Sequence, residues 1–573
     1  MRGPVAPKDP EKKRPGFYIM REKEIFGMPQ EDGSGVQFLY ESDGRLISSA
    51  KIVGNIQDEE ILNLLKTTAG FRCLVHSIGV RVETENQEET VEFAFQMYGK
   101  HDIYGSGTIL KMQLMGNGME QKLSLDSILW SEDDKEPGQI WFRFLKPGQM
   151  AKVSVVLYVK DGFQIPEQEE EEVPKLVGDE ANAMIARSLL SKGNPFRLKR
   201  VIEKAKRGEE VTLAFIGGSI TQGAGAVPIH EACYAWKTYC AFRKHFGNEK
   251  NVHYLKAGVG GTPSELGMIR FERDILREQE QPDLIVIEFA VNDEGDETKG
   301  ICYESLVRKA LNLPWNPAVV LLFSVFADDW NLQERLSPVG YHYHLPMVSI
   351  RDAVSPQFGL TREQGRVISR NQFFYDMFHP SNLGHFIMAK CLEYLFEITE
   401  KSMDGEDDSR ILQEKQEPVI GCDFQEVQLL DKKNLFQDAH ICCGSFLETD
   451  RDLQCVEMDF NVIPTPQFPY NWQYKGENFH GEITPFTMDI VCKSLLLVFK
   501  DSGEIHAGKA QIYVDDTHVL TVDPLQNGWT HCNTVILFNE EETKEHRIII
   551  QPAKGEEQKN FTILGFGYVK TDK

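Results

Sequence analysis

The sequence predicts an α/β domain with a parallel sheet, placed between two all-β domains. The rhythm of the apolar residues changes twice along the 573 residues, and each change falls at a charged stretch. These stretches, "PEQEEEEVPK" (166–175) and "KSMDGEDDSRILQEKQEP" (401–418), are typical of solvated linkers. A chain of this length also exceeds one ordinary domain. We therefore expect domains at 1–170, 176–400 and 418–573.

The first and third predicted domains share a pattern of short apolar segments separated by turn residues. Segments such as "VRVETENQEETVEFAFQMY" and "KVSVVLYV" in the first are short and alternate apolar with polar residues, which is typical of strands with one buried face. The third has "SLLLVFKDSG" and "KAQIYVDDTHVLTVD", in which Asp-Ser-Gly and Asp-Asp indicate hairpin turns. Both regions are expected to be β-sandwiches or jelly rolls.

The middle domain has continuous apolar runs that alternate with helical patterns such as "YAWKTYCAFRKHFG". Strands buried on both faces look like this, so the runs predict a parallel sheet of about five strands covered by helices. The runs are "VTLAFIG" (211–217), "VHYLKAGV" (252–259), "DLIVIEFAV" (283–291), "AVVLLFSVF" (318–326) and "LPMVSI" (345–350).

Composition excludes several classes of function. With 62 basic and 87 acidic residues, the net charge of −25 disfavours nucleic acid and anionic membranes as partners. The sequence has no apolar stretch of membrane-spanning length, and its N-terminus has no apolar core of a signal peptide. Eleven cysteines without CxxC framing indicate buried thiols in a reducing compartment. We expect a cytoplasmic protein; whether it forms a homo-oligomer is left open.

Three polar or glycine positions follow directly on predicted strands. They are Ser219 in "FIGGS", Gly261 in "AGVGGT" and Asn292 in "AVND". Ligands of parallel sheets bind at the carboxyl ends of the strands, so these three positions are expected to meet on one rim.

Later in the chain, "DMFHP" places Asp376 three residues before His379. A serine hydroxyl becomes a nucleophile when a base takes its proton, and a carboxylate holds that base in the right tautomer. Ser219, His379 and Asp376 can fill these roles, with N–H groups of Ser219, Gly261 and Asn292 as oxyanion donors. Each motif alone has a plain structural alternative: Gly-Gly-Ser as a turn, Asn-Asp as a cap, and Asp-x-x-His-Pro before a helix capped by Ser381. Their order and strand context together favour catalysis.

"GGSIT", "AGVGGT", "AVND" and "DMFHP" resemble blocks I, II, III and V of the SGNH hydrolases, also called GDSL-like esterases and lipases. The resemblance covers roughly 180–400 and is strongest to bacterial carbohydrate acetyl esterases. It implies a flavodoxin-like three-layer α/β/α fold, a Ser219–His379–Asp376 triad, and an oxyanion hole of Ser219, Gly261 and Asn292. The sequence departs from the family pattern at Gly218, where aspartate is usual, and at Ala290, where glycine is usual.

The resemblance leaves the substrate open, because SGNH enzymes include lipases, thioesterases and polysaccharide deacetylases. The resemblance to carbohydrate acetyl esterases implies an acetylated oligosaccharide, derived from plant or other polysaccharides, as substrate, and aromatic loops suit sugar faces. A lipid or thioester acylhydrolase is the alternative among enzymes, and a catalytically idle sugar-binding protein is the alternative outside them. The mechanism requires no cofactor or metal, and "HYH" alone is a weak metal motif. The substrate-contact candidates are Trp330, His344 and Trp472, and Trp529 in "QNGWTH" is another aromatic candidate.

Overall fold

The computed structural model describes residues 14–42, 44–168, 171–277, 279–408, 417–435 and 439–570. They belong to two units: unit 1 runs to Leu176 and also takes in 366–384, while unit 2 comprises 177–365 and everything from His385 onward. The N-terminal stretch without a signal-peptide pattern lies mostly outside the described residues, as do residues 409–416 of the predicted linker.

Unit 1 holds two antiparallel sheets, ordered β1-β9-β4-β7 and β2-β3-β8-β5-β6. Both contribute to one apolar core, for example through Phe17 of the first sheet and Phe142 of the second, each completely buried. The strands are β1 (Gly16–Phe26), β2 (Met28–Pro29), β3 (Gly35–Tyr40), β4 (Val75–Thr84), β5 (Thr90–Gly99), β6 (Ile109–Met115), β7 (Gln121–Ser124), β8 (Asp134–Phe144) and β9 (Met150–Val159).

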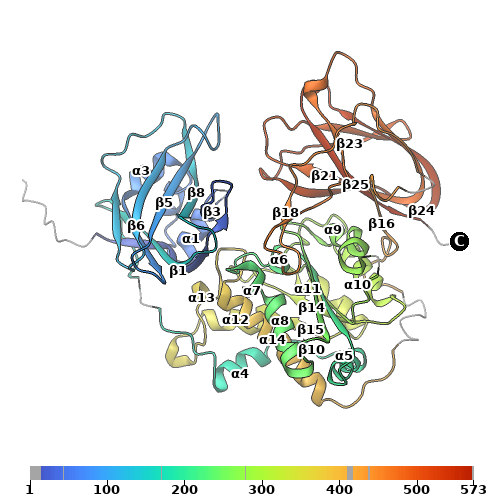
Figure 1. Cartoon of the computed structure of the whole chain (residues 1–573), viewed down its shortest axis with the longest axis horizontal. Coiled ribbons are helices and arrows are strands. Elements are labelled where there is room, and N and C mark those ends of the chain that lie inside the picture. Colours follow the sequence, from blue (N-terminus) through green and yellow to red (C-terminus); the bar gives the residue numbers. More distant parts are fainter. Residues whose placement is uncertain are drawn as a thin grey trace, which may run out of the picture. The chain divides into compact units, whose positions relative to one another are not determined.

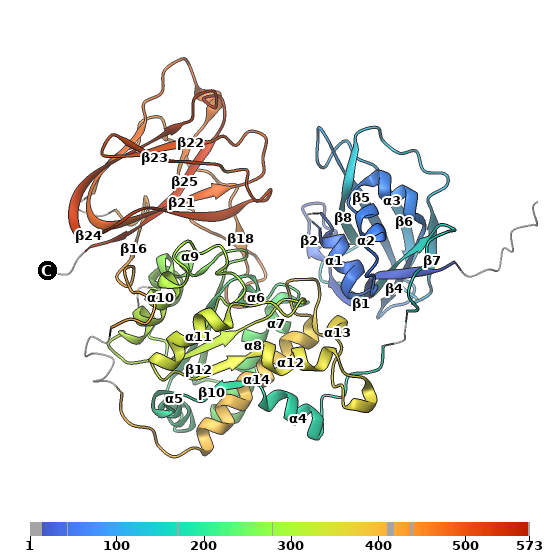
Figure 2. The ribbon, with the colours of Figure 1, turned by 180° about the vertical axis from the view of Figure 1, so that it is seen from behind.

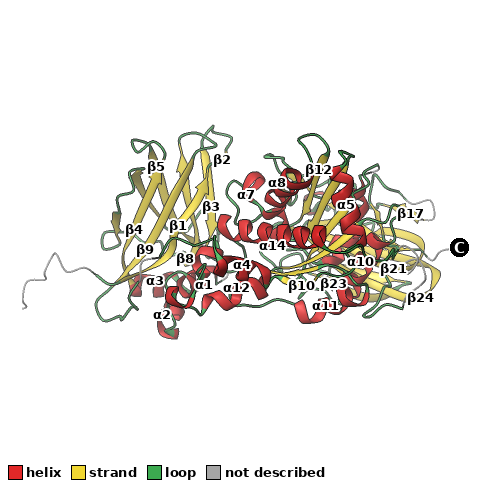
Figure 3. Ribbon diagram, turned by 90° about the horizontal axis from the view of Figure 1, so that it is seen from below, coloured by secondary structure: helices red, strands yellow, loops and turns green. Residues whose placement is uncertain are grey.

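Three helices lie between β3 and β4, and the sequence analysis did not predict them (Figure 3). They are α1 (Arg45–Ile52), α2 (Glu59–Leu64) and α3 (Thr68–Leu74). Side-chain caps begin two of them, since Asp58 accepts from the Glu60 N–H and Thr67 from the Gly70 N–H. The region is therefore mainly β but not all-β. A fourth short helix, α13 (Arg370–Phe373), lies in the segment that returns to unit 1.

The central sheet of unit 2 has the order β10-β15-β14-β13-β11-β12. Figure 1 labels β10, β14 and β15 of this sheet, and Figure 2 labels β10 and β12. Its last five strands in chain order run parallel in the flavodoxin-like order 2-1-3-4-5, and β10 adds an antiparallel edge that the sequence did not predict. The strands are β10 (Leu189–Ser191), β11 (Val211–Gly217), β12 (Val252–Gly258), β13 (Leu284–Glu288), β14 (Ala318–Phe323) and β15 (Met347–Ser349).

Helices cover both faces of this sheet. All residues of β11 are buried; Ala214 and Ile216 join the core that includes α9 and α10, while the Phe215 ring lies 5.9 Å from that of Tyr234 in α8. This burial on both faces explains the continuous apolar run. The helical elements are α4 (Asp179–Ala186), α5 (Phe196–Lys206), α6 (Ser219–Gln222), α7 (Ile229–Ala232), α8 (Tyr234–Phe246), α9 (Ser264–Ile269), η1 (Glu272–Leu276), α10 (Ile301–Leu311), α11 (Gln333–His342), α12 (Ile350–Phe358), η2 (Arg362–Gln364) and α14 (Asn382–Lys401).

The C-terminal part of unit 2 is an eight-stranded antiparallel sheet with the path β16-β25-β21-β24-β22-β23, to which β17 and β20 are added. A separate pair joins β18 to β19. The elements are β16 (Gln428–Leu430), β17 (Ala439–Cys442), β18 (Cys455–Val456), β19 (Thr465–Pro466), β20 (Trp472–Tyr474), η3 (Gly476–Asn478), β21 (Phe486–Asp501), β22 (Ala510–Val514), β23 (Thr517–Val522), β24 (His531–Pro552) and β25 (Phe561–Val569).

This C-terminal sheet shares a core with the α/β region. Leu496 of β21 and Leu564 of β25 belong to the same buried cluster as Ile269 and Phe271. A Cβ added to Gly567 would lie 2.7 Å from Ile269, so β25 packs directly on α9. The predicted boundary near 401–418 therefore separates two kinds of structure but not two cores.

Two further properties bear on the sequence analysis. All eleven cysteines lie in the described residues and are free thiols, five of them buried. None of the helices described here combines the length and the apolar character needed to cross a bilayer.

Candidate active site

Three of the predicted site residues meet at the carboxyl edge of the parallel sheet in unit 2. Ser219 follows β11 after Gly218, the Gly260–Gly261 pair follows β12, and Asn292 follows β13. Because β11 lies between β12 and β13, the three loops are neighbours. Sheets of this order bind ligands at this switch point, so the expected rim is confirmed.

Close backbone packing surrounds Ser219. A Cβ on Gly218 would lie 2.1 Å from the Asn292 Oδ1 atom, and one on Gly260 would lie 3.7 Å from the Ser219 Cβ atom. A side chain at residue 218 would therefore displace the Asn292 amide, which accounts for glycine at a position where the family usually has aspartate. The Asn292 amide is thereby placed beside the residue that precedes the serine.

Gly261 has a backbone that favours glycine, with φ of +70°. Hydrogen bonds on both sides of Gly260 hold this loop: its N–H donates to the Gln222 Oε1 atom at 3.0 Å, and its carbonyl accepts from the Gln454 Nε2 atom at 2.8 Å. Gln454 comes from the C-terminal region and is buried. Sequence analysis missed Gln454, because 194 residues separate it from its partner and no local pattern marks it.

Arg270 fixes the strand ends beneath the serine. Its side chain is completely buried and donates to the Gly217 carbonyl at 2.9 Å and to the Ala257 carbonyl at 2.8 Å. Asp274 accepts from the same guanidinium at 3.0 Å and neutralises its charge. The ends of β11 and β12 are thus tied together, at the residue before Gly218 and at the third residue before Gly260. In the sequence, Arg270 reads as one more polar residue of an amphipathic helix.

Buried carboxylates hold the loop that carries Asn292. Asp293 accepts from the backbone N–H and the hydroxyl of Ser264, both at 2.8 Å, and so ties this loop to the start of α9. Burial, helped by the charge of Asp296, raises the pKa of Asp293 to about 8 and that of Glu265 to about 9. These groups stay protonated at neutral pH.

Asp376 and His379 belong to unit 1, where they form a close pair. The His379 Nδ1 atom lies 2.9 Å from the Asp376 Oδ2 atom, and the backbone N–H groups of Phe378 and His379 donate to Oδ1 at 2.8 Å. Burial alone would raise the pKa of Asp376, but the His379 charge and these hydrogen bonds hold it at about 2. Ser381 caps α14 as predicted, accepting from the Gly384 N–H at 3.2 Å.

An ionised Asp376 decides the tautomer of His379. A carboxylate can only accept hydrogen bonds, so the proton of the neutral imidazole resides on Nδ1 and the Nε2 atom is left as a proton acceptor. This arrangement is what a general base requires.

Trp472 is not a sugar platform. Only 2% of its surface is exposed, and its ring packs 5.5 Å from Phe486 and 6.2 Å from Phe566 in the core of the C-terminal sheet. Trp472 is therefore a core residue, and the substrate-contact prediction for Trp472 is wrong.

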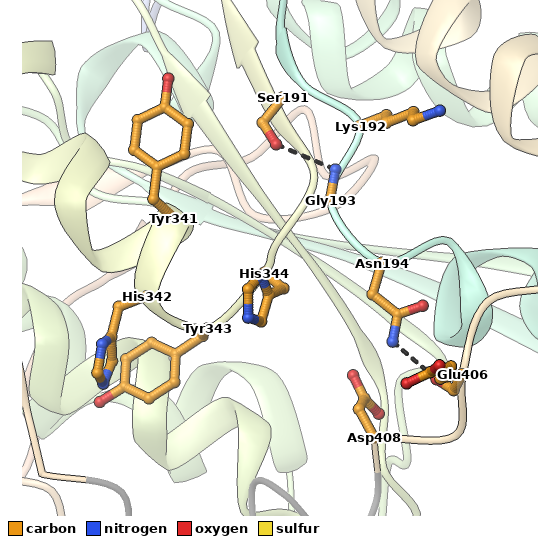
Figure 4. A pocket seen from close by; sticks show the side chains of 10 residues that line it. All are labelled: Ser191, Lys192, Gly193, Asn194, Tyr341, His342, Tyr343, His344, Glu406 and Asp408. Carbon is orange, nitrogen blue, oxygen red and sulfur yellow. Dashed lines mark hydrogen bonds between the residues drawn. The ribbon is translucent and has the colours of Figure 1, made fainter.

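His344 lies at the other edge of the parallel sheet, because it precedes the amino end of β15 whereas Ser219 follows the carboxyl end of β11. Figure 4 shows it with His342 and Tyr341 in a cavity of about 560 Å³ lined also by residues 191–194. The prediction that His344 contacts substrate at Ser219 is therefore wrong. Trp330, in contrast, follows the carboxyl end of β14, where its ring stacks on Phe326 with centroids 5.5 Å apart.

Trp529 reaches the glycine loop. Its Cζ2 atom is the nearest neighbour of a Cβ built on Gly261, at 2.8 Å, and 44% of the side chain is exposed. The ring also stacks on His531, with centroids 4.5 Å apart. An exposed aromatic face thus borders the proposed oxyanion loop.

Two clusters of potential metal ligands occur in the described residues: His245, Glu393 and Glu397, and the buried set Glu265, Asp296 and Cys302. Members of both have protein partners. Glu393 pairs with His245 and Lys390, while Asp296 accepts from the Thr298 and Gly300 N–H groups. These partners account for the clusters as protein structure.

Residues 215–387 match the family model described as the GDSL-like Lipase/Acylhydrolase family. All five residues of the proposed triad and oxyanion hole fall within this range. A search of curated protein sequences finds no match.

Solved structures similar to this chain include a two-domain esterase, CEX, described as active on acetylated mannans. The similarity has a TM-score of 0.57 at 24% identity and covers 68% of this chain and 99% of that one. The same esterase co-crystallised with mannopentaose matches at 25% identity with the same TM-score and coverage. A catalytic mutant of Axe2, an acetylxylan esterase from Geobacillus stearothermophilus, matches at 17% identity over 35% of this chain and 99% of that one, with a TM-score of 0.26, too low for an argument from fold.

The strand order, the loops at the switch point and the family match agree with one another. Residues 215–387 form an SGNH, or GDSL-like, hydrolase domain, and the chain is a carboxylic ester hydrolase.

Proposed function

We propose that the protein is a serine esterase that removes O-acetyl groups from oligosaccharides. The observation that carries this proposal is the meeting of Ser219, the Gly260–Gly261 loop and Asn292 at the switch point of the sheet. A nucleophile beside two hydrogen-bond donors suits acyl transfer, in which negative charge develops on the carbonyl oxygen.

In this mechanism the Ser219 Oγ atom attacks the ester carbonyl while His379 Nε2 accepts its proton. The Gly261 N–H and the Asn292 amide stabilise the oxyanion. His379 then donates the proton to the departing sugar oxygen, which leaves acetyl-Ser219. Water, deprotonated by His379, hydrolyses this acyl-enzyme and releases acetate. Asp376 keeps the imidazole in the required tautomer throughout.

The substrate class is supported by two observations. The similar esterase CEX is described as active on acetylated mannans and was crystallised with mannopentaose. In this chain, the partly exposed ring of Trp529 beside Gly261 offers a surface for contact with a sugar ring. We also propose that the β-rich regions at 1–170 and 418–573 are sandwich or jelly-roll modules, and that the protein acts in the cytoplasm on short fragments.

A panel of esters tests the substrate proposal. Acetate release from acetylated manno- and xylo-oligosaccharides is compared with hydrolysis of 4-nitrophenyl acetate and 4-nitrophenyl octanoate. We expect the highest kcat/KM on an acetylated oligosaccharide, because sugar contacts remote from the ester stabilise the transition state. Faster turnover of octanoate with no gain from any sugar would favour the lipid or thioester alternative. Sugar binding without turnover of any ester would favour the idle binding protein.

A further inference from the structure

Unit 1 contains the loop with Asp376 and His379 although most of this unit comes from the N-terminal third of the chain. The loop is thus anchored to a β-rich region far away in the sequence. The contacts that anchor it are specific and largely buried, and a single lysine makes two of them.

Lys23 occupies an inward-facing position of the edge strand β1. Lys23 lies on the same face of the strand as the buried Ile25, and only 6% of Lys23 is exposed. A bulge precedes it, since the register with β9 shifts between Met20 and Lys23 and Glu22 adopts a left-handed φ of +48°. Bulges of this kind re-aim side chains and are common beside active sites. Lysine is rarely buried in this way without a compensating partner.

The partners of Lys23 are two carbonyls of the catalytic loop. Its ammonium group donates to the Asn371 carbonyl at 3.0 Å and to the Phe374 carbonyl. Phe374 lies two residues before Asp376, and the ammonium also lies 5.9 Å from the centre of the Tyr375 ring. Burial lowers the pKa of Lys23 to about 8, while the charges of Glu171 and Asp376 act to keep it protonated.

Glu171 adds a second anchor from the charged stretch 166–175. Its carboxylate accepts from the Ser369 hydroxyl and from the Asn371 side-chain amide, each at 2.8 Å. The Gln372 amide also donates to the Glu172 carbonyl at 2.6 Å. This part of the predicted linker is therefore attached to the loop, and Asn371 is held by Lys23 and Glu171 together.

We propose that Lys23 is a positioning residue for the esterase reaction: by binding the Asn371 and Phe374 carbonyls it sets the orientation of the Asp376–His379 pair. The inference rests on the proposed catalytic roles of that pair. It assigns the N-terminal β-rich region a part in catalysis, because this region holds the general base in the orientation that proton transfer requires.

Kinetics of Lys23→Met in the full chain test this role. Methionine keeps the length and apolar stem of lysine but cannot donate to the carbonyls. We expect kcat on 4-nitrophenyl acetate to fall by about 10- to 100-fold with KM changed less than threefold, as expected for misplacement of a catalytic group. The matched control is Lys100→Met, which removes another lysine-to-carbonyl bond of unit 1, from Lys100 to Glu132 at 2.8 Å, and should retain wild-type kcat.

Chemical rescue separates positioning from general stability. In Lys23→Ala, added n-propylamine should restore at least a tenth of the wild-type kcat, because the amine replaces the missing part of the side chain. Lys100→Ala should not respond to it. If the Lys23 variants do not fold, Glu171→Ala removes the second anchor and is expected to lower kcat at least fivefold while the fold is retained.

The outcomes distinguish this inference from the function on which it rests. The positioning role alone is overturned if folded Lys23→Met keeps the wild-type kcat while His379→Ala loses activity. Where Lys23→Met does not fold, a wild-type kcat in Glu171→Ala has the same meaning. Full activity of His379→Ala overturns the proposed catalytic pair itself.

Discussion

At residue 218 a side chain would collide with the Asn292 amide, and this gives a direct test of the oxyanion site. Gly218→Ala would place a Cβ 2.1 Å from the Asn292 Oδ1 atom, so the amide must move. We expect kcat to fall by about 10²- to 10³-fold, the usual cost of losing one oxyanion donor, with little change in KM. Gly295→Ala is the control, since its Cβ would meet nothing within 4 Å. Equal activity of both variants would exclude Asn292 from the role.

Asp376→Asn tests the partner of the histidine. Asparagine keeps the shape but can donate to His379 Nδ1, which favours the wrong tautomer and leaves Nε2 protonated. By analogy with other triads, kcat should fall by about 10⁴-fold while substrate binding persists. Stopped-flow kinetics with 4-nitrophenyl acetate measure this. A loss of tenfold or less would mean that His379 works without the carboxylate.

Arg270 carries a stability prediction. Arg270→Met removes a buried guanidinium from two carbonyls and from Asp274, and breaking a buried pair from one side costs about 3–5 kcal/mol. Urea denaturation measures the loss. The control is Arg207→Met, whose ion pair with Glu209 is exposed and should change stability by less than about 1 kcal/mol. Similar midpoints for the two variants would contradict the account of Arg270.

Sequence reasoning predicted site residues that stand in short local motifs, and it missed residues whose contacts lie far away in the sequence. Ser219 and Asn292 are recognisable because each directly follows a strand in a short motif. Gln454 acts through a glycine far away in the sequence, and Lys23 acts through backbone carbonyls. Trp472 misled because aromatic residues in a polar context look alike whether they fill a core or face solvent.

The loop after β13 and the start of α9 carry a pH prediction. Burial raises the pKa of Glu265 from 4.5 to about 9 in the folded state. Between these two pH values the folded state holds a proton on Glu265 that the unfolded state has lost. Stability is therefore greatest below the unfolded-state pKa and falls as pH rises towards 9, by about 1.4 kcal/mol per pH unit for a group that keeps its proton only when folded.

Urea denaturation of Glu265→Gln between pH 6 and 9 tests whether the free energy of unfolding falls with rising pH because of Glu265. The glutamine variant should lose stability less steeply with pH than the wild type. Glu294→Gln, an exposed neighbour, is expected to follow the wild-type slope. A parallel decline of Glu265→Gln and the wild type would show that Glu265 does not titrate in this range.

Helices and strands could be predicted from the sequence where their apolar residues follow a clear pattern. The five parallel strands are visible because burial on both faces produces uninterrupted apolar runs. β10 spans three partly buried residues and pairs antiparallel at an edge, so its sequence carries little signal. The helices α1 to α3 were missed because each is only six to eight residues long.

At the scale of the molecule, unit 2 is expected to unfold as one body. Phe468 of the C-terminal region is completely buried in the core shared with the α/β sheet. Phe468→Ala should cost about 3–5 kcal/mol and shift a single calorimetric transition of unit 2. Val519→Ala, with 40% of the side chain exposed, is the control. Separate transitions, with the α/β region unaffected by Phe468→Ala, would contradict a common core.

The division into two units was not predictable from composition. The charged stretches indicated where the chain changes its type of secondary structure, and the structure does change from α/β to β near 401–418. They could not reveal that 366–384 returns to the N-terminal region or that Glu171 binds it. These pairings join residues that are 198 to 348 positions apart in the sequence.

The central claim is that Ser219 is the nucleophile of an esterase, and acetate release by Ser219→Ala tests it most directly. With an acetylated manno-oligosaccharide at saturating concentration, the account predicts a kcat about 10⁶-fold below the wild type while circular dichroism and the unfolding midpoint stay unchanged. A folded alanine variant that releases acetate at the wild-type rate would contradict it.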